Sequence, residues 1–296
     1  MTAAGADAPD VTVVISAAGV AAHLAEQIDA LSAQDAGCAW ELIVADNGLT
    51  VAGRARADEL VTRVRAGRVI DAKQIKGPSY GRNVGAESAR APLVLFCDDD
   101  DVVADGWIAA LRAALATADL VGGELRVDRI NSPQALAWRE PPSGGRLPDM
   151  HEHLSYALSS NMGVRREVFL RIGGFDTALY PGEDVDLSWR VQYAGGTVAF
   201  APGAVVDYRY RDDVRTYLRQ QRAYGRVSGE VLVKHRDRGA VGINRWADAA
   251  RLAVGVRNLV RARDRRVMWM GAVAYVGAEA RVRTAAWWRA RRGRAS

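Results

Sequence analysis

Cysteine, signal-type segments and long apolar runs are scarce in this sequence of 296 residues. Only Cys38 and Cys97 occur, and one pair in so long a chain excludes a disulfide framework and favours a reducing, cytoplasmic compartment. Residues 1–10 lack the basic start and the apolar stretch of a secretory signal, and we expect them to form a flexible tail. The most apolar stretch, residues 267–278, is shorter than the roughly 20 residues that span a bilayer, so we expect it to lie on a membrane and not to cross one.

Charge is distributed unevenly along the chain. The net charge is +5, and a positive sign alone suits nucleic acid, an anionic membrane or an acidic substrate. The acidic clusters lie in the first two thirds, whereas arginines crowd the last third, notably Arg261, Arg263, Arg265, Arg266, Arg281, Arg283, Arg289, Arg291, Arg292 and Arg294. Arginines on amphipathic helices that also carry Trp and Met fit an anionic membrane face better than nucleic acid. Two arrangements therefore stay open for these helices: their apolar faces pack on the rest of the protein and leave the arginines in water, or one helix also lies at the inner face of the membrane as a peripheral contact.

Strand-like and helical patterns alternate over the first 125 residues. Strand-like runs occur at Val11–Ser16, Glu41–Ala45, Val69–Ala72 and Leu93–Cys97. Between them, apolar residues recur at helical spacing, as in Leu24, Ile28 and Leu31, in Leu60, Val61 and Val64, and in Trp107, Leu111 and Leu115. Such alternation predicts an α/β fold, with a mostly parallel sheet flanked by helices.

The pattern changes after residue 125. Prolines and glycines between Asn131 and Met150 predict a loop without regular structure that moves over a site. Strand-like segments return at 159–165 and 197–201, with helical patterns at 166–172 and 185–194. From residue 213 to the end we expect an amphipathic helical extension, with Leu252, Val256 and Leu259 on one stripe.

An acidic run follows the fourth predicted strand. Asp98, Asp99, Asp100 and Asp101 come directly after Leu93–Cys97, and ligands of open α/β sheets bind at the carboxyl ends of the strands. Because side chains alternate along an extended chain, Asp98 and Asp100 can share one divalent cation, which can bridge a diphosphate. An isolated acidic run is more often a solvated turn or a helix start. Repulsion between four adjacent carboxylates makes a bound cation the better explanation here.

Three other polar positions have a functional and a structural interpretation. Asp46 ends the second strand, where it can accept hydrogen bonds from a nucleobase or a ribose, although Asp-Asn-Gly is also an ordinary turn. Arg82 lies at a predicted helix start, which suits a phosphate but equally an ordinary cap. Asp184, beside Glu183, can take the proton of an attacking hydroxyl, or the pair can simply begin a helix.

Seven segments, taken in order, resemble the second family of inverting glycosyltransferases, which have the GT-A fold. The segments, which lie between Val11 and Arg226, are VTVVIS, ELIVADNG, GRNVG, LVLFCDDDDVV, SSNMGVRREVF, IGGFD and GEDVDLSWR. The resemblance implies a metal-dependent inverting hexosyltransferase that uses Mn²⁺ or Mg²⁺. Its donor would be a nucleotide diphosphate sugar, and its acceptor a hydroxyl of a lipid-linked or cell-envelope glycan. It also implies a donor-binding half at 11–125, an acceptor-binding half at 126–212 and an added extension at 213–296.

The resemblance assigns roles position by position. It implies that Asp184 is the general base, that Glu183 and Asn161 bind the acceptor, and that Asp98 and Asp100 hold the metal. The donor-binding residues that it implies are Ser16, Ala17, Asp46, Arg82, Asp98 and Asp99.

The sequence departs from the family pattern at three places. The first strand ends in Ser16-Ala17-Ala18-Gly19 where the family often has proline, an aromatic residue and asparagine. The segment Val205–Arg209 lacks the histidine that many members use as a further metal ligand, and residues 220–225 lack the QxxRW form of processive synthases. The last departure favours an enzyme that adds a single sugar.

Two other functions share features with this sequence. A nucleotidyltransferase has a similar sheet and metal-binding aspartates, but residues 16–23 provide no glycine-rich basic loop. A catalytically silent sugar-nucleotide-binding or scaffold protein would keep the fold, but every candidate carboxylate is retained here. A dehydrogenase would need GxGxxG after the first strand, which is absent.

Overall fold

The computed structural model describes residues 8–139, 142, 144–240 and 263–292. The chain divides into two compact units. The first unit contains Met1–Arg129, Pro142–Pro148 and Ser155–Arg209, and the second contains Ile130–Pro141, Asp149–Leu154 and Tyr210–Ser296. The predicted tail falls mostly on residues 1–7, and the stripe Leu252, Val256 and Leu259 falls on 241–262, so both lie outside the described residues.

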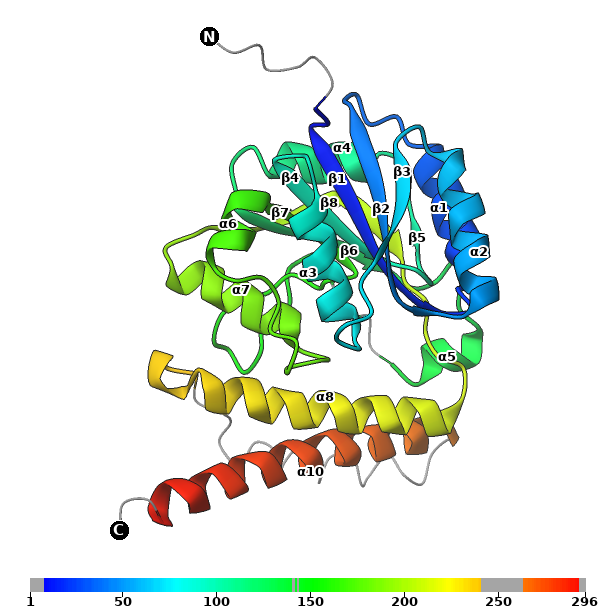
Figure 1. Ribbon diagram of the computed structural model, residues 1–296. Helices are drawn as coiled ribbons and strands as arrows, with labels where there is room; N and C mark the ends of the chain where they lie inside the picture. Colours follow the sequence, from blue (N-terminus) through cyan, green and yellow to red (C-terminus); the bar gives the residue numbers. More distant parts are fainter. Residues whose placement is uncertain (1–7, 140–141, 143, 241–262, 293–296) are drawn as a thin grey trace. The chain divides into compact units, whose positions relative to one another are not determined.

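The described part of the first unit contains one sheet in the strand order β3-β2-β1-β4-β7-β6-β8-β5 (Figure 1). The strands are β1 (Val11–Gly19), β2 (Trp40–Leu49), β3 (Gly67–Asp71), β4 (Leu93–Asp98), β5 (Val102–Val103), β6 (Leu120–Arg126), β7 (Asn161–Arg165) and β8 (Val198–Asp207). Strands β3, β2, β1 and β4 are parallel, as predicted, whereas β7 is antiparallel to both β4 and β6.

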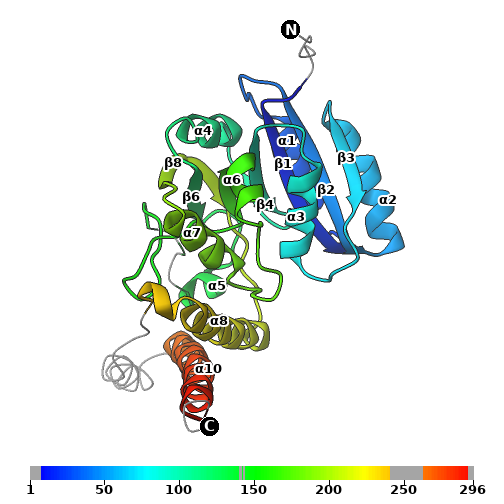
Figure 2. The same ribbon diagram turned by 60° about the vertical axis from the view of Figure 1, so that its left-hand side comes forward.

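Helices cover both faces of this sheet (Figures 1 and 2). Helices α1 (Leu24–Ser32), α2 (Val51–Leu60, continued by the 3-10 turn η1, Val61–Arg63) and α4 (Trp107–Ala114) pack on one face. Helices α3 (Pro78–Ser88), α6 (Arg166–Arg171) and α7 (Glu183–Tyr193) pack on the other. Of the helix stripes that we predicted from spacing, the one formed by Leu24, Ile28 and Leu31 is fully buried.

Helix α3 lies unusually close to strand β1. A Cβ atom on Gly85 would come within 2.3 Å of Val14, and one on Gly81 within 2.2 Å of the Ser16 hydroxyl oxygen. Glycine at these two positions therefore lets the helix that carries Arg82 approach the end of β1. The same close approach places Arg82 beside the carboxyl ends of the parallel strands.

Two local predictions were wrong. Asp46, Asn47 and Gly48 do not form a free turn, because β1 continues to Gly19 and pairs it with Leu49, so β2 extends beyond them. The stretch after Asn131 is not wholly irregular, because it contains helix α5 (Pro133–Ala137). The Ser132 hydroxyl accepts a hydrogen bond from the N–H of Ala135 at 3.1 Å and caps this helix.

The described part of the second unit consists of helices and short connections. Besides α5 it contains α8 (Val214–Lys234), the 3-10 turn η2 (Arg236–Arg238) and α10 (Arg263–Arg292). Figures 1 and 2 show α8 and α10 side by side. Within the described part of the chain, we find no helix that combines the length and the apolarity needed to cross a membrane.

Candidate functional site

The candidate site begins at the carboxyl ends of β1, β2 and β4. In the sheet register, Ser16 of β1 pairs with Asp98 of β4, and the next residue, Ala17, pairs with Asp46 of β2. Ala17 is fully buried, and Ser16 is partly exposed. The predicted donor-binding residues of these three strands are therefore neighbours along one edge of the sheet, as the strand order requires.

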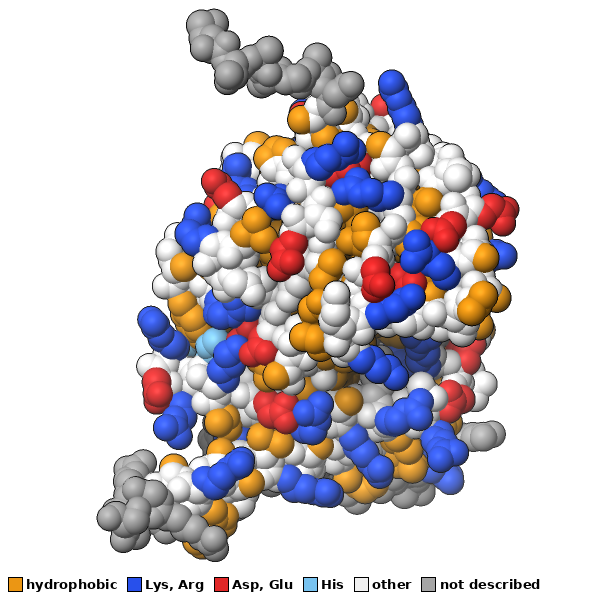
Figure 3. Space-filling model, viewed as in Figure 1, with side chains coloured by type: hydrophobic (Ala, Val, Ile, Leu, Met, Phe, Trp, Pro, Cys, Tyr) orange, Lys and Arg blue, Asp and Glu red, His pale blue; other side chains and the backbone are white. Residues whose placement is uncertain are grey.

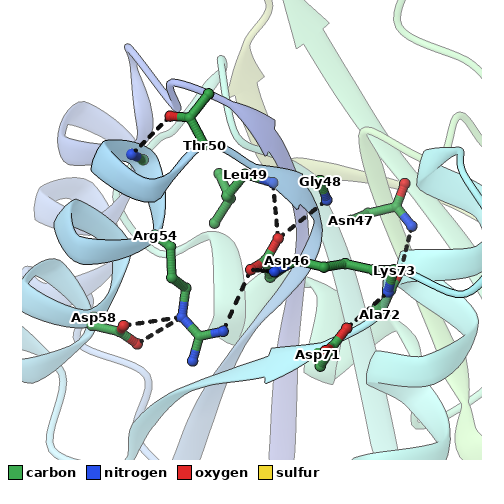
Figure 4. A network of polar contacts seen from close by, with 11 residues as sticks. Asp46, Asn47, Gly48, Leu49, Thr50, Arg54, Asp58, Asp71, Ala72 and Lys73 are labelled. Carbon is green, nitrogen blue, oxygen red and sulfur yellow. Dashed lines mark hydrogen bonds and ion pairs between the residues drawn. The ribbon is translucent and has the colours of Figure 1, made fainter.

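The carboxylate of Asp46 is fully buried and already bound by protein groups (Figure 4). Its Oδ1 accepts hydrogen bonds from the N–H groups of Gly48 (3.1 Å) and Leu49 (2.8 Å), and its Oδ2 lies 2.8 Å from the Lys73 ammonium and 3.4 Å from the Arg54 guanidinium. Burial alone would raise the pKa of Asp46, but these donors outweigh it and lower the pKa. Asp46 thus holds two partly exposed cations at the sheet edge, and its contact with a base stays a prediction.

Asn47 has a positioning role that the sequence did not indicate. Its amide donates to the carbonyl oxygens of Ala72 (2.5 Å) and Ile75 (2.8 Å), and its side-chain oxygen accepts from the N–H of Gly77 at 2.7 Å. Gly77 has a φ of +132° and immediately precedes α3. Asn47 therefore fixes the loop that leads from β3 into the helix of Arg82.

The acidic run that begins at Asp98, the last residue of β4, brings three carboxylates together. One oxygen each of Asp98, Asp100 and Asp101 lies within 4.8 Å of the others. Asp98 and Asp100 are partly exposed, whereas Asp101 is fully buried. The Oδ2 atom of Asp101 is buried without a hydrogen-bond partner. Clustered oxygen ligands with one buried oxygen unpaired fit a hard divalent cation.

Asp101 was not among the predicted ligands, and its surroundings explain its place in the cluster. Its Oδ1 accepts a hydrogen bond from the N–H of Arg209 at 2.8 Å, and the Arg209 guanidinium donates to the carbonyl of Asp100 at 2.7 Å. Burial, reinforced by the charges of Asp98 and Asp100, raises the pKa of Asp101 well above its ordinary value. Burial and the charges of Asp100 and Asp98 also raise the pKa of Asp99, to about 7.

Arg82 joins the acidic run to the start of α7. It is 3% exposed, and it donates to Asp98 at 2.5 Å and to Glu183 at 2.9 Å. Burial alone would lower the pKa of Arg82, but the charges of Asp98 and Glu183 raise it above its ordinary value. The Nε of Arg82 is buried and has no hydrogen-bond partner. In this state Arg82 bridges two carboxylates, and its predicted contact with a diphosphate stays a prediction.

Glu183 and Asp184 begin helix α7 and differ in their surroundings. Glu183 is 2% exposed and accepts hydrogen bonds from Arg82 and, at 2.9 Å, from the N–H of Gly182. Asp184 is partly exposed and accepts hydrogen bonds from the N–H groups of Val185 (2.8 Å) and Ser159 (3.4 Å). Burial and the charge of Glu183 raise the pKa of Asp184 to about 7. A carboxyl group with this pKa can accept a proton near neutral pH.

Asn161, which we predicted to bind the acceptor, lies instead in the core. It is fully buried; its oxygen accepts from the indole N–H of Trp107 at 2.8 Å, and its amide donates to the carbonyls of Glu124 and Ala204. These bonds use its hydrogen-bonding groups to join α4 and three strands, so the geometry gives Asn161 a structural role. Asp207 is likewise engaged, in a two-bond ion pair with Arg126.

The sequence matches a known family over most of its length. A family model described as "Glycosyltransferase like family 2" matches residues 9–226. The chain belongs to glycosyltransferase family 2. This membership confirms the resemblance that the seven segments carry, and the match covers the whole of the site described above.

Curated glycosyltransferases are similar to much of this chain. The pre-mycofactocin glycosyltransferase of Mycobacterium tuberculosis is 30% identical over 244 residues, which are 78% of this chain and 49% of that protein. Glycosyltransferase AglE of Haloferax volcanii is 24% identical over 196 residues, which are 65% of this chain and 64% of that protein. The chain therefore spans about half the length of the mycobacterial relative.

Solved structures of similar fold confirm the GT-A fold. A mannosyltransferase of Pyrobaculum calidifontis, in complex with GDP-Man and Mn²⁺, has a TM-score of 0.61 and 17% identity, covering 94% of this chain and 88% of that one. Residues 1–349 of S. aureus TarS, in complex with UDP, have a TM-score of 0.51 and 16% identity, covering 93% and 92%. At these identities the likeness supports the fold alone.

Proposed function

We propose that the protein is a cation-dependent inverting glycosyltransferase that moves one sugar from a nucleotide diphosphate sugar to an acceptor hydroxyl. Residues 11–125 would bind the donor and 126–212 the acceptor, while 213–296 form an extension. The observation that carries the proposal is the Arg82 bridge. It joins Asp98, in the candidate cation cluster, to Glu183, the neighbour of the candidate base Asp184.

The carboxylate cluster has the chemistry to hold Mn²⁺ or Mg²⁺. Asp98, Asp100 and Asp101 would supply the oxygen ligands, and the unpaired Oδ2 of Asp101 supports that assignment. A cation there would offset negative charge on the departing diphosphate. Arg82, which carries a positive charge between Asp98 and Glu183, keeps these two carboxylates close without mutual repulsion.

Asp184 is the proposed general base. Its carboxyl pKa of about 7 keeps a substantial fraction ionised at neutral pH, and that fraction is basic enough to take the acceptor's proton. The Ser159 and Val185 N–H groups hold the carboxylate in place. Attack by the deprotonated hydroxyl opposite the leaving diphosphate would invert the anomeric carbon in a single displacement.

A panel of nucleotide diphosphates tests the donor site. GDP and UDP come first, because structures of similar fold contain GDP-Man and UDP. We expect one of them to raise the melting temperature, and Mn²⁺ to be required, since a ligand that binds the native state stabilises it. Asp100→Ala should abolish this effect, whereas Asp105→Ala, an exposed acid just after the cluster, should preserve it. The donor-site proposal is wrong if no nucleotide shifts the melting temperature with metal present.

Sugar release separates the active enzyme from a silent binding protein. With Mn²⁺ and the donor selected by the panel, the wild-type chain should hydrolyse the donor slowly in the absence of acceptor. Asp184→Asn should bind the donor with unchanged affinity but release at least about 100-fold less sugar. Donor binding without sugar release by either protein would favour the silent scaffold, and equal sugar release by both would point to a different base. Formation of a nucleoside triphosphate and sugar 1-phosphate from the donor and added pyrophosphate would instead indicate a nucleotidyltransferase.

A lipid-linked acceptor is the finer part of the proposal. It rests on the arginine-rich C-terminal helices, since an enzyme held at a membrane surface meets acceptors that are anchored there. Incubation with the labelled donor sugar and a total lipid extract should transfer label to the organic phase. Transfer only to water-soluble acceptors would remove this part and leave the transferase assignment intact.

A further inference from the structure

Helices α8 and α10 pack through small residues that define the inner face of α10. A Cβ atom on Gly225 of α8 would lie 2.0 Å from the carbonyl oxygen of Tyr275, and one on Gly271 of α10 would lie 2.3 Å from the hydroxyl of Tyr217. Glu279, one turn after Tyr275, is buried on the same side. The side of α10 that carries Gly271, Tyr275 and Glu279 therefore faces α8.

The opposite side of α10 exposes large apolar side chains. Met270 is 44% exposed, Val273 38%, Trp287 49% and Trp288 54%. At about 100° per residue, Met270, Val273 and Trp288 lie at least about 100° around the helix from both Gly271 and Glu279. Trp287 lies about 80° from Glu279, at the margin of this outer face. The rings of Trp287 and Trp288 touch edge to face, with centroids 4.9 Å apart. If α10 packed only on α8, polar residues would be expected on this outer side.

Exposed arginines lie on both helices of the pair. On α10, Arg266 and Arg281 are exposed on the same side as Met270, and on α8 a second row of exposed arginines recurs at helical spacing. That row consists of Arg215, Arg219, Arg222 and Arg226. In Figure 3, basic and hydrophobic side chains lie intermingled over the helix pair. The pair therefore combines positive charge with exposed aromatic surface.

The acids of the helix pair whose side chains the structure describes are each paired with a basic group. Among the α10 side chains that the structure describes, the single acid is Glu279, which lies 3.1 Å from His151, 3.0 Å from the Ser228 hydroxyl and 2.9 Å from Arg283. The single acid in the α8 sequence, Glu230, pairs with Arg226 at 2.7 Å. The exposed surface of the pair consequently keeps a positive balance.

We propose that the outer face of α10, together with the arginine row of α8, docks on an anionic lipid bilayer. Indole rings favour the interface between lipid headgroups and acyl chains, and arginines bind headgroup phosphates. Helix α10, with its 30 residues, is about 45 Å long at 1.5 Å per residue, so it can lie along the surface. Nucleic acid would match the arginines but would leave Met270 and Val273 without an apolar partner. This docking does not depend on sugar transfer.

Cosedimentation of the full chain with vesicles tests the proposal. We expect binding to vesicles of phosphatidylcholine that contain about 30 mol % phosphatidylglycerol, and at least about tenfold weaker binding to vesicles of phosphatidylcholine alone. Raising the salt to about 0.5 M should release the protein, because screening shortens the reach of surface charges. Acyl chains brominated near the headgroup should quench tryptophan fluorescence.

Paired variants separate the two parts of the surface. Trp287→Ser combined with Trp288→Ser should remove the quenching and weaken binding at least about tenfold, whereas Val51→Ser, at an exposed apolar position of the first unit, should change neither. Arg219→Gln combined with Arg222→Gln should weaken binding about fivefold per arginine, and Arg56→Gln, exposed on α2, is the matched control.

Three outcomes would overturn the proposal. The first is absence of binding to the anionic vesicles at low salt by the folded wild-type chain. The second is stronger binding to duplex DNA than to vesicles with no effect of the tryptophan variant, which would assign the arginines to nucleic acid. The third is a dimer that the tryptophan variant dissociates in gel filtration, which would make the face a contact between two copies.

Discussion

Asp184→Asn should make the protein more stable at alkaline pH while abolishing catalysis. The carboxyl pKa of Asp184 is raised from an ordinary value of 3.8 to about 7 by burial and by Glu183. That change corresponds to about 4 kcal/mol in favour of the neutral form. The pKa of Asp184 is higher in the folded protein than in the unfolded chain. The folded protein is therefore most stable below pH 3.8, where the carboxyl is neutral in both states, and it loses stability as the pH rises from there through about 7.

The magnitude can be worked out at two pH values. At pH 5 the folded carboxyl is still neutral and the unfolded one is ionised, which costs the wild type about 2 kcal/mol. At pH 8 the full cost of about 4 kcal/mol applies. Asparagine carries no such cost, so its stabilising effect should grow by about 2 to 3 kcal/mol between pH 5 and pH 8. For a unit of this size that is a change of about 4 to 12 °C in melting temperature.

Calorimetry of both proteins from pH 5 to 8 measures the effect, and Asp105→Asn is the control for loss of an exposed acid. In parallel, kcat/KM of the wild type should rise with pH, reach half of its maximum near pH 7 and level off about one unit higher. Asp184→Asn should lose about 100- to 10,000-fold in kcat. If the difference in melting temperature between wild type and Asp184→Asn is the same at pH 5 and pH 8, Asp184 is ionised in the folded protein and the reasoning is refuted.

Three further substitutions test contacts inside the first unit and inside the second. Arg82→Met leaves the buried carboxylate of Glu183 without its partner and should lower the free energy of unfolding, measured in urea, by about 3 to 5 kcal/mol. Arg82→Lys should recover part of that loss. An effect of Arg82→Met below about 1 kcal/mol would show that the bridge is dispensable for stability. Burial alone would raise the pKa of Glu279, but its hydrogen bonds from His151, Arg283 and Ser228 lower it. The stability that this carboxylate adds is therefore present above its ordinary pKa of 4.5 and is lost as the pH falls through the lowered folded-state pKa. Glu279→Gln should unfold about 1.5 to 3 kcal/mol more easily at pH 7, and this difference should shrink as the pH falls below 4.5. Gly225→Val should push α10 away from α8 and lower the free energy of unfolding, followed by circular dichroism, by at least about 2 kcal/mol. Gly277→Ala is the control, because an added Cβ there meets nothing within 4 Å; it should be neutral or stabilise the protein by up to about 1 kcal/mol.

Local patterns in the sequence determined the elements of the sheet and the position of the acidic run. Alternating and 3.6-residue periodicities predicted β1, β2 and β4 and the buried stripe of α1, because both depend only on how side chains point along a regular backbone. The parallel arrangement that follows from β–α alternation was enough to bring Asp46 and Asp98 to one edge.

Partnerships between distant residues were decided only by the tertiary structure. Arg82 meets Glu183 across 101 positions of sequence, and Asp101 meets Arg209 across 108, and no local pattern encodes either distance. The same reason explains Asn161, whose polar side chain is a plausible ligand in the sequence but serves Trp107 and two backbone carbonyls in the core. On α10 the sequence supplied tryptophans and arginines, but only packing against α8 determined which of them remain exposed, because a helix has no outer face until a neighbour covers the inner one.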